Sequence, residues 1–226
     1  GAGCGTPRRL SLPTAGERPG RRGDNDRMTR TGGEQRRKQL VSHAVRLFGE
    51  RGFEGASLDA VADAAGVRKQ TILYYFPGKD ELFDACVDEL ATRLGTSLER
   101  ALEGEDERGR PERVISAIFR LTEEWPEFPQ FAREASRRGP EVITRVTGVL
   151  EPLRKRALVH LERGMHDGTF RRQDPTLLLF TMYTAVVGSL TEAGVLRALG
   201  GGPQSRKALK RREAELIEFV RGALEP

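Results

Sequence analysis

The chain has 226 residues, of which 37% are hydrophobic and 31% are charged, so it can bury the core of one large domain or two small ones. Two cysteines exclude a disulfide framework and a cysteine-rich zinc site, and three histidines exclude a histidine-rich metal centre. No run of roughly 18 apolar residues occurs, and the first residues lack an apolar segment. We therefore expect a cytoplasmic protein with no membrane span, secretory signal, bound metal or cofactor.

Positive charge is concentrated at the N-terminal end of the chain. Residues 1–33 contain seven arginines and only three acidic residues, whereas residues 81–226 are nearly balanced. A basic end favours an anionic partner, with nucleic acid as the first candidate, but charge alone favours a solvated tail without a partner. Residues 1–33 also hold eight glycines, three prolines and only scattered apolar side chains, which predicts a flexible basic tail.

Helical order is expected to begin at Glu34 and to produce three helices in the next fifty residues. Apolar residues from Leu40 to Phe48 recur at helical spacing, and Gly52 is expected to end this first helix as a left-handed cap. Ser57 is placed to cap a second helix, over about 58–64, which Gly66 ends. A third short helix is expected over about 68–75.

The second and third helices, joined by a turn that carries glycine, predict a helix-turn-helix over about 57–76. The third helix is short enough for a DNA major groove, and its inward residues should be Val67, Ile72 and Phe76. Its outward face is expected to comprise Arg68, Lys69, Gln70, Thr71, Leu73 and Tyr75. Arginine and glutamine can address base edges, while lysine, threonine and tyrosine can reach phosphates or bases.

A turn at Pro77-Gly78 precedes a long helix that starts near Lys79. The free N–H groups of this helix start and the Lys79 ammonium are expected to point toward one anion, and a DNA phosphate fits there.

Residues 34–83 resemble the DNA-binding domain of the TetR family of bacterial transcriptional regulators. The strongest match runs from Lys69 to Phe83, where the aromatic run Tyr74-Tyr75-Phe76, Lys79 and Leu82-Phe83 stand at the family's spacing. One departure is Leu73, where the family usually has a tyrosine that reaches DNA. The alternative is a plain helical bundle with all three aromatic residues in its core, which leaves Lys79 unexplained.

The resemblance implies an all-α protein: an N-terminal three-helix DNA-binding domain over 34–94, and a helical effector-binding and dimerisation domain over 95–226. It implies that DNA is contacted by Ser57, Arg68, Lys69, Gln70, Thr71, Leu73, Tyr74, Tyr75 and Lys79.

Helices in the second half are expected over about 80–102, from Pro111 to before Trp125, and over about 130–138, 141–166, 176–199 and 205–224. Cys86 lies on the apolar stripe of the first and is expected to be a core residue. The helix over 176–199 is apolar almost all round, so it must be covered on both sides.

The resemblance implies that the last two helices pair with their copies in a homodimer, and physical reasoning agrees because a surplus apolar helix needs a partner surface. The alternative is that the domain buries this helix internally. Candidate dimer-interface residues are Val186, Val187, Leu190, Leu216, Phe219 and Val220. The family also implies an apolar pocket for an effector, with candidate lining residues Phe119, Trp125, Phe131, Met165 and Tyr183.

The function that follows is a DNA-binding transcriptional regulator without enzymatic activity. We expect a homodimer that binds a palindromic double-stranded DNA operator, acts as a repressor and is released by a small apolar effector. The rival interpretation is a small helical enzyme or lipid carrier that uses the C-terminal bundle as a pocket. No catalytic triad, phosphate-binding loop or dinucleotide glycine motif stands out.

Overall fold

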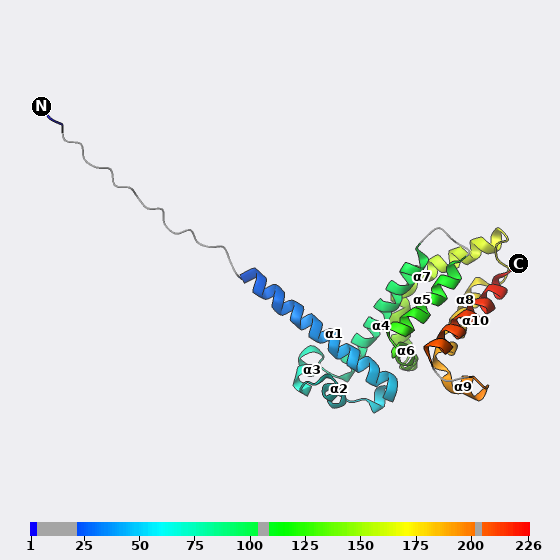
Figure 1. The fold of residues 1–226 in the computed structure, drawn as a ribbon, viewed down its shortest axis with the longest axis horizontal. Coiled ribbons are helices and arrows are strands. Elements are labelled where there is room, and N and C mark those ends of the chain that lie inside the picture. Colours follow the sequence, from blue (N-terminus) through cyan, green and yellow to red (C-terminus); the bar gives the residue numbers. More distant parts are fainter. Residues whose placement is uncertain (4–21, 104–108, 202–204) are drawn as a thin grey trace. The chain divides into compact units, whose positions relative to one another are not determined.

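The computed structural model describes residues 1–3, 22–103, 109–201 and 205–226 (Figure 1). The described residues form helices and no strands, which confirms the all-α fold. Residues 1–36 and 37–226 form two units. None of the described helices combines the length and the apolar character needed to cross a membrane.

The first helix, α1 (Arg22–Gly55), starts ahead of the expected residue Glu34. Gly32 and Gly33 do not end the helix, because a helix that is already nucleated gains a hydrogen bond with each added residue, and glycine only weakens it. The rest of the predicted flexible tail, residues 4–21, lies outside the described residues. Gly52 has a φ of 71° and a ψ of 171°, so it makes a kink within α1 and not the left-handed cap that was expected. The positive φ explains why glycine occupies this position.

The helix-turn-helix comprises α2 (Leu58–Ala65) and α3 (Lys69–Tyr75), and α4 (Lys79–Leu102) follows it. These helices and α1 share a core around Phe48, Ile72 and Phe83, each at most 1% exposed. Cys86 is fully buried there and its thiol donates to the Val41 carbonyl at 3.7 Å, which confirms its core role. Burial raises the pKa of this thiol well above its usual value.

The same core continues into the second half of the chain. The helix α5 (Arg110–Glu124), Trp125 directly after it, and the helix α6 (Phe128–Arg137) contribute Leu121, Trp125, Phe128 and Phe131 to the cluster that contains Phe48. In addition, α4 is one unbroken helix across residue 94, where a domain boundary was expected. Because of this shared core, α1 and α4, which flank the helix-turn-helix, pack on α6 through Phe48, Phe83 and Phe131.

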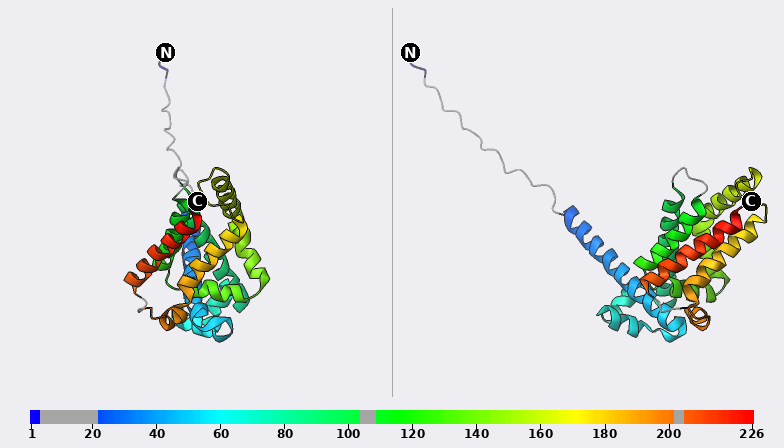
Figure 2. Two further views of the ribbon diagram at one scale, coloured as in Figure 1. Left: turned by 90° about the vertical axis from the view of Figure 1, so that its right-hand side faces the viewer. Right: turned by 45° about the vertical axis from the view of Figure 1, so that its right-hand side comes forward.

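A second core lies between α5, α7 (Pro140–His166), α8 (Pro175–Thr191) and α10 (Arg206–Leu224). Figures 1 and 2 show α8 and α10 side by side at the C-terminal end of the fold. Phe119, Leu161 and Val220 are among its buried members. The sequence therefore builds two adjoining apolar clusters, one under the helix-turn-helix and one in the C-terminal bundle.

The expectation of a single helix over 176–199 is wrong. The chain forms α8 and then a short helix, α9 (Ala193–Ala198), separated at Glu192, whose backbone has φ −93° and ψ 48°. The Glu192 carboxylate pairs with Arg133 of α6 at 3.2 Å, and Gly194 follows the break. The apolar pattern of the sequence continues across Glu192, so the pattern alone does not reveal that the helix ends there and that the chain changes direction.

Hydroxyl groups along α8 are bonded to its own backbone. Thr181 donates to the Leu177 carbonyl at 2.8 Å, Thr184 to that of Thr181 at 2.9 Å, and Thr191 to that of Val187 at 2.9 Å. The Asp174 side chain caps the start of the helix by accepting from the N–H groups of Thr176 and Leu177. Since α8 also contains no charged residue, these bonds satisfy much of its side-chain hydrogen-bonding capacity within the helix.

Candidate nucleic-acid interface

Local hydrogen bonds set the turn between α2 and α3. The Ser57 hydroxyl accepts from the Ala60 N–H at 3.1 Å and caps α2, as predicted. At the other end Gly66 has a φ of 64°, and the following Val67 N–H donates back to the Ala62 carbonyl at 3.0 Å. A left-handed residue of this kind reverses the chain at low steric cost only when it is glycine. The turn therefore fixes where α3 begins, directly after Arg68.

The two faces of α3 differ sharply. Ile72 is fully buried and Phe76, which follows the helix, is 2% exposed, so both hold α3 against the core as predicted. On the other side Tyr74 is 81% exposed and Leu73 is 40% exposed. Arg68, Lys69 and Gln70 are exposed as well, and Thr71 is half-buried. The helix thus presents guanidinium, ammonium, amide and phenol groups together on one rigid surface.

Tyr75 differs from the expected outward position. It is half-buried, packs against the core and meets the Tyr74 ring edge-on at a centroid distance of 5.0 Å. The reason is helical geometry, since Tyr75 stands three residues after the buried Ile72 and so shares its side of the helix. The plain-bundle alternative fails here, because Tyr74 is the most exposed residue of the aromatic run and only Phe76 is fully buried.

Lys69 already has a carboxylate partner. Its ammonium lies 2.8 Å from Asp59 of α2, and both side chains are largely exposed. Exposed pairs of this kind contribute at most about 1 kcal/mol. A DNA phosphate can therefore replace Asp59 at small cost, so the predicted role of Lys69 is compatible with the geometry.

Lys79 is the first residue of α4, as expected, but its ammonium faces the protein. It lies 4.2 Å from the centre of the Phe53 ring and 3.5 Å from the Glu54 carbonyl oxygen. A Cβ added at Gly78 would lie 2.7 Å from a Glu81 carboxylate oxygen, so this carboxylate folds back over the start of the helix. The predicted phosphate contact requires Lys79 and Glu81 to move, and it stays a prediction.

The comparisons with known proteins agree with this geometry. Residues 40–86 match the family model described as bacterial regulatory proteins, tetR family. The chain carries a DNA-binding domain of the TetR family. It is an HTH-type transcriptional regulator, and the rival interpretation as an enzyme or lipid carrier gains no support from its relatives.

Named relatives of this chain are distant. The transcriptional regulator RutR of Escherichia coli K12 is 24% identical over 151 residues, which cover 66% of this chain and 71% of RutR. The transcriptional activator FasR of Mycolicibacterium smegmatis is 33% identical over 50% of this chain and 53% of its own length. Among solved structures, the regulator FadR of Bacillus subtilis in complex with stearoyl-CoA has a TM-score of 0.65 at 17% identity, covering 83% of this chain and 99% of that one.

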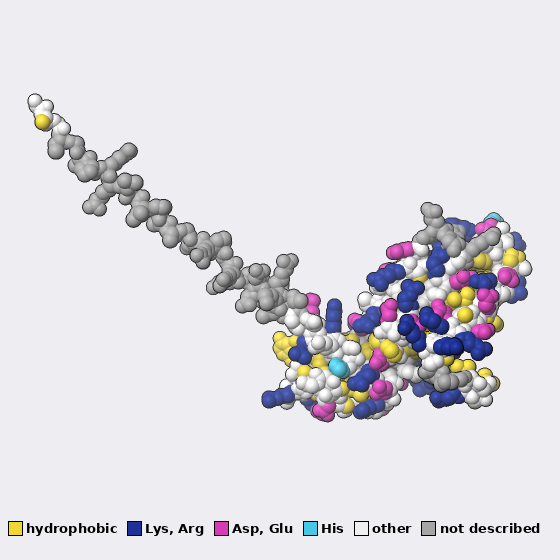
Figure 3. Space-filling view, in the orientation of Figure 1, with side chains coloured by type: hydrophobic (Ala, Val, Ile, Leu, Met, Phe, Trp, Pro, Cys, Tyr) yellow, Lys and Arg dark blue, Asp and Glu magenta, His cyan; other side chains and the backbone are white. Residues whose placement is uncertain are grey.

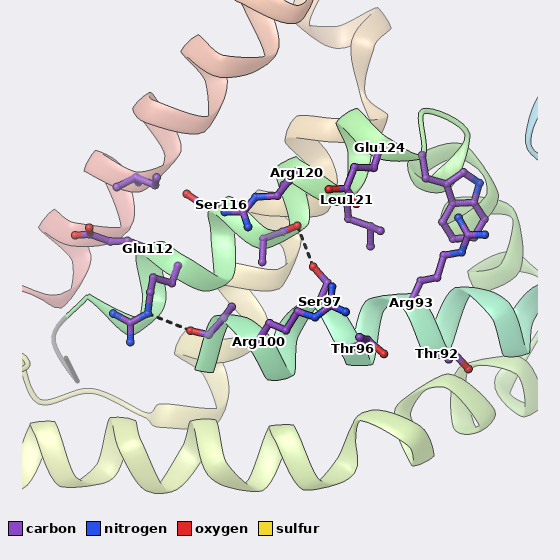
Figure 4. Close-up of a pocket in the computed structure, with 15 residues that line it drawn as sticks. Thr92, Arg93, Thr96, Ser97, Arg100, Glu112, Ser116, Arg120, Leu121 and Glu124 are labelled. Atoms are coloured by element: carbon purple, nitrogen blue, oxygen red, sulfur yellow. Dashed lines mark hydrogen bonds between the residues drawn. The ribbon is translucent and has the colours of Figure 1, made fainter. Parts of the chain in front are cut away.

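The residues predicted to line an effector pocket are not brought together. Phe119 and Met165 belong to the core of the C-terminal bundle, Trp125 and Phe131 to the core under the helix-turn-helix, and Tyr183 is 56% exposed on α8. Of these five, only Trp125 borders the groove of about 790 Å³ between α4 and α5 (Figure 4). Aromatic residues at helical spacing serve here mainly as packing.

The predicted dimer residues are divided in a similar way. Val186, Leu190, Leu216 and Val220 are buried within the chain because α8 and α10 cover each other there, and Val187 is half-buried. Phe219 is 62% exposed, as an interface residue must be. Phe219 lies on α10. On α8 the large exposed apolar side chains are Leu177, Phe180 and Tyr183, each more than half exposed.

Sequence reasoning missed a connection between α6 and the kink of α1. The Phe53 N–H donates to the Glu134 carboxylate at 2.7 Å, eighty-one positions away in the sequence. The Arg138 guanidinium lies 3.6 Å from the centre of the Phe53 ring and pairs with Asp80 at 2.8 Å. A lone glutamate on an amphipathic helix gives no sequence signal of such a role.

Proposed function

We propose that this transcriptional regulator is a cytoplasmic repressor that binds a palindromic operator and leaves it when a small-molecule effector binds. The observation that carries the proposal is the surface of α3, where Arg68, Gln70 and Tyr74 are exposed on a helix anchored by Ile72. Guanidinium and amide groups form paired hydrogen bonds with base edges in a major groove. The exposed phenol of Tyr74 adds a contact to a DNA phosphate or sugar.

The proposal includes a homodimer formed through α8 and α10. Leu177, Phe180 and Tyr183 follow one side of α8, and Phe219 adds an exposed ring from α10. Large apolar side chains in such a group mark an interaction surface. A symmetric pair of subunits presents two copies of α3 to two half-sites, about 34 Å or one helical turn apart, and this favours a palindromic operator.

Contacts on α6 support a route from effector to DNA. Neighbouring residues of this helix reach both halves of the chain, since Glu134 binds the Phe53 N–H and Arg133 pairs with Glu192 at the break after α8. An effector that favours a different position of α6 shifts the population toward dimers whose α3 helices no longer fit both half-sites. FadR, crystallised with stearoyl-CoA, supports a ligand-responsive mechanism in a protein of this fold.

The test is selection of bound sequences from random duplex DNA with the purified full-length chain, followed by competition binding. We expect an inverted repeat, and we expect Gln70→Ala to relax one position in each half-site. Arg156→Ala on α7 is the control, because it removes an exposed arginine far along the chain from the helix-turn-helix. Failure to enrich any sequence contradicts the proposal, and enrichment of a single half-site contradicts its dimeric part. A reporter gene placed behind the selected operator then separates repression from activation.

A further inference from the structure

The groove between α4 and α5 is lined by one polar stripe from each helix (Figure 4). Thr92, Thr96 and Arg100 follow one another at intervals of four on α4. On α5 the same spacing joins Glu112, Ser116, Arg120 and Glu124. Because four residues nearly complete a helical turn, each stripe lies on one face of its helix. The sequence therefore places polar groups on both walls, where two packed helices usually meet through apolar side chains.

Hydrogen bonds between the two helices hold the floor of the groove. Ser97 of α4 donates to the Ala117 carbonyl at 3.2 Å, and the Arg113 Nε of α5 donates to the Ala101 carbonyl at 3.1 Å. Buried alanine, leucine and tryptophan side chains lie beneath the polar walls. Direct hydrogen bonds thus join α4 and α5 along the groove.

Positive charge exceeds negative charge along this lining, which has four arginines and two glutamates. Glu112 is already neutralised, because Arg221 of α10 donates to it at 2.9 and 2.8 Å. In contrast, the guanidinium groups of Arg100 and Arg120 have no hydrogen bond or ion pair within the described part of the chain. Figure 3 shows further Lys and Arg side chains over α5 and α10 on the face drawn. Two guanidinium groups in the groove are therefore available to an anion.

We propose that this groove binds a small organic phosphate, with Arg100 and Arg120 holding the phosphate oxygens. A guanidinium matches a phosphate with two parallel hydrogen bonds, and the Thr96 and Ser116 hydroxyls offer further donors on the same walls. A volume of about 790 Å³ exceeds what an inorganic ion fills and lies in the range of small-molecule sites. That this ligand is the effector rests on the proposed function, and it replaces the wholly apolar effector that the family resemblance implied.

The test uses the position of the single tryptophan of the chain. Trp125 borders the groove, and the Arg93 guanidinium lies 4.5 Å from the centre of its ring, so ligand binding changes its fluorescence. The full-length protein is titrated with adenosine diphosphate, with adenosine as the uncharged counterpart and with citrate as a carboxylate polyanion. Calorimetry of the same mixtures checks each affinity. We expect adenosine diphosphate to bind, adenosine not to bind, and citrate to bind at least about tenfold more weakly.

Arg100→Ala and Arg120→Ala should each lower the affinity for adenosine diphosphate by about tenfold or more, since each removes a charged hydrogen-bond donor. Arg156→Ala is the matched control on α7 and should leave the affinity unchanged. Equal binding of adenosine, equal binding of citrate, or an equal loss in the control variant overturns the proposal. Thermal unfolding of every variant confirms that the comparison is between folded proteins.

Binding to the selected operator without ligand keeps this inference separate from the proposed function. If the chain binds its operator but shows no response to adenosine diphosphate, the groove proposal alone fails. If the chain binds no duplex while the titration behaves as expected, the proposed function fails and the groove remains a phosphate site. Addition of adenosine diphosphate to the operator complex then tests the effector role, which is refuted when DNA affinity stays constant at saturating ligand.

Discussion

Replacement of Glu134 by alanine should destabilise the whole chain by an amount that the structure allows us to calculate. The change leaves the Phe53 N–H without the carboxylate that now accepts its hydrogen bond at 2.7 Å. A hydrogen bond to a charged group contributes about 1.5–3 kcal/mol when buried. Because this contact is only partly buried, we expect a loss of about 1–2 kcal/mol in the free energy of unfolding.

For a chain of this size, 1 kcal/mol corresponds to about 2–4 °C in melting temperature, so Glu134→Ala should lower it by about 2–8 °C. Glu134→Gln keeps an oxygen acceptor without the charge and should lose less than the alanine variant. Glu162→Ala on α7 removes an exposed glutamate with no such contact and should change stability by less than about 0.5 kcal/mol. Thermal and urea unfolding give these values. The reasoning is refuted if Glu134→Ala matches the Glu162 control, or if the glutamine variant loses as much as the alanine variant.

Four further substitutions test other parts of the structure. Gln70→Ala should remove about 1–3 kcal/mol of discrimination at one base pair, measured by competition with altered operators, and an unchanged preference places this residue beside the groove. Lys79→Ala should weaken binding to all duplexes alike and reduce the slope of log affinity against log salt by about one, whereas a loss confined to one sequence argues against a phosphate contact. Phe180→Glu should give monomers in sedimentation and weaker operator binding, and a variant that remains dimeric moves the interface away from α8. Gly164→Ala should cost about 1–3 kcal/mol in urea unfolding because its Cβ would collide with the Phe170 ring, and unchanged stability means that this ring can shift freely.

The helix-turn-helix could be predicted from the sequence because local chemistry specifies it. Ser57 as a cap, Gly66 as a left-handed turn and the apolar Ile72 each act within a few residues of their position. Helix caps and glycine turns of this kind can be predicted from neighbouring residues alone, without knowledge of the remaining fold. The position of Tyr75 was the exception, since an outward position was expected although its spacing of three from Ile72 sets it on the buried side of the helix.

The C-terminal half was less predictable because its decisive contacts are long-range. Val186 and Phe219 look equivalent as apolar residues of two helices, yet only the packing of α8 on α10 buries the first and exposes the second. The pairing of Glu192 with Arg133, which accompanies the end of α8, joins residues far apart in the sequence. The groove between α4 and α5 likewise appears only when the packing of the two helices places a polar stripe of each along one hollow.

The hydroxyl groups of α8 have a consequence for the thermodynamics of assembly. Thr181 and Thr184 lie among Leu177, Phe180 and Tyr183, and each donates its hydroxyl hydrogen to a carbonyl of its own helix. A hydroxyl that loses water without a replacement bond costs about 1–3 kcal/mol, and these two keep their bond when water leaves. The Thr181 and Thr184 hydroxyls can therefore lose their contact with water without losing a hydrogen bond, and they do not oppose the burial of the apolar side chains beside them.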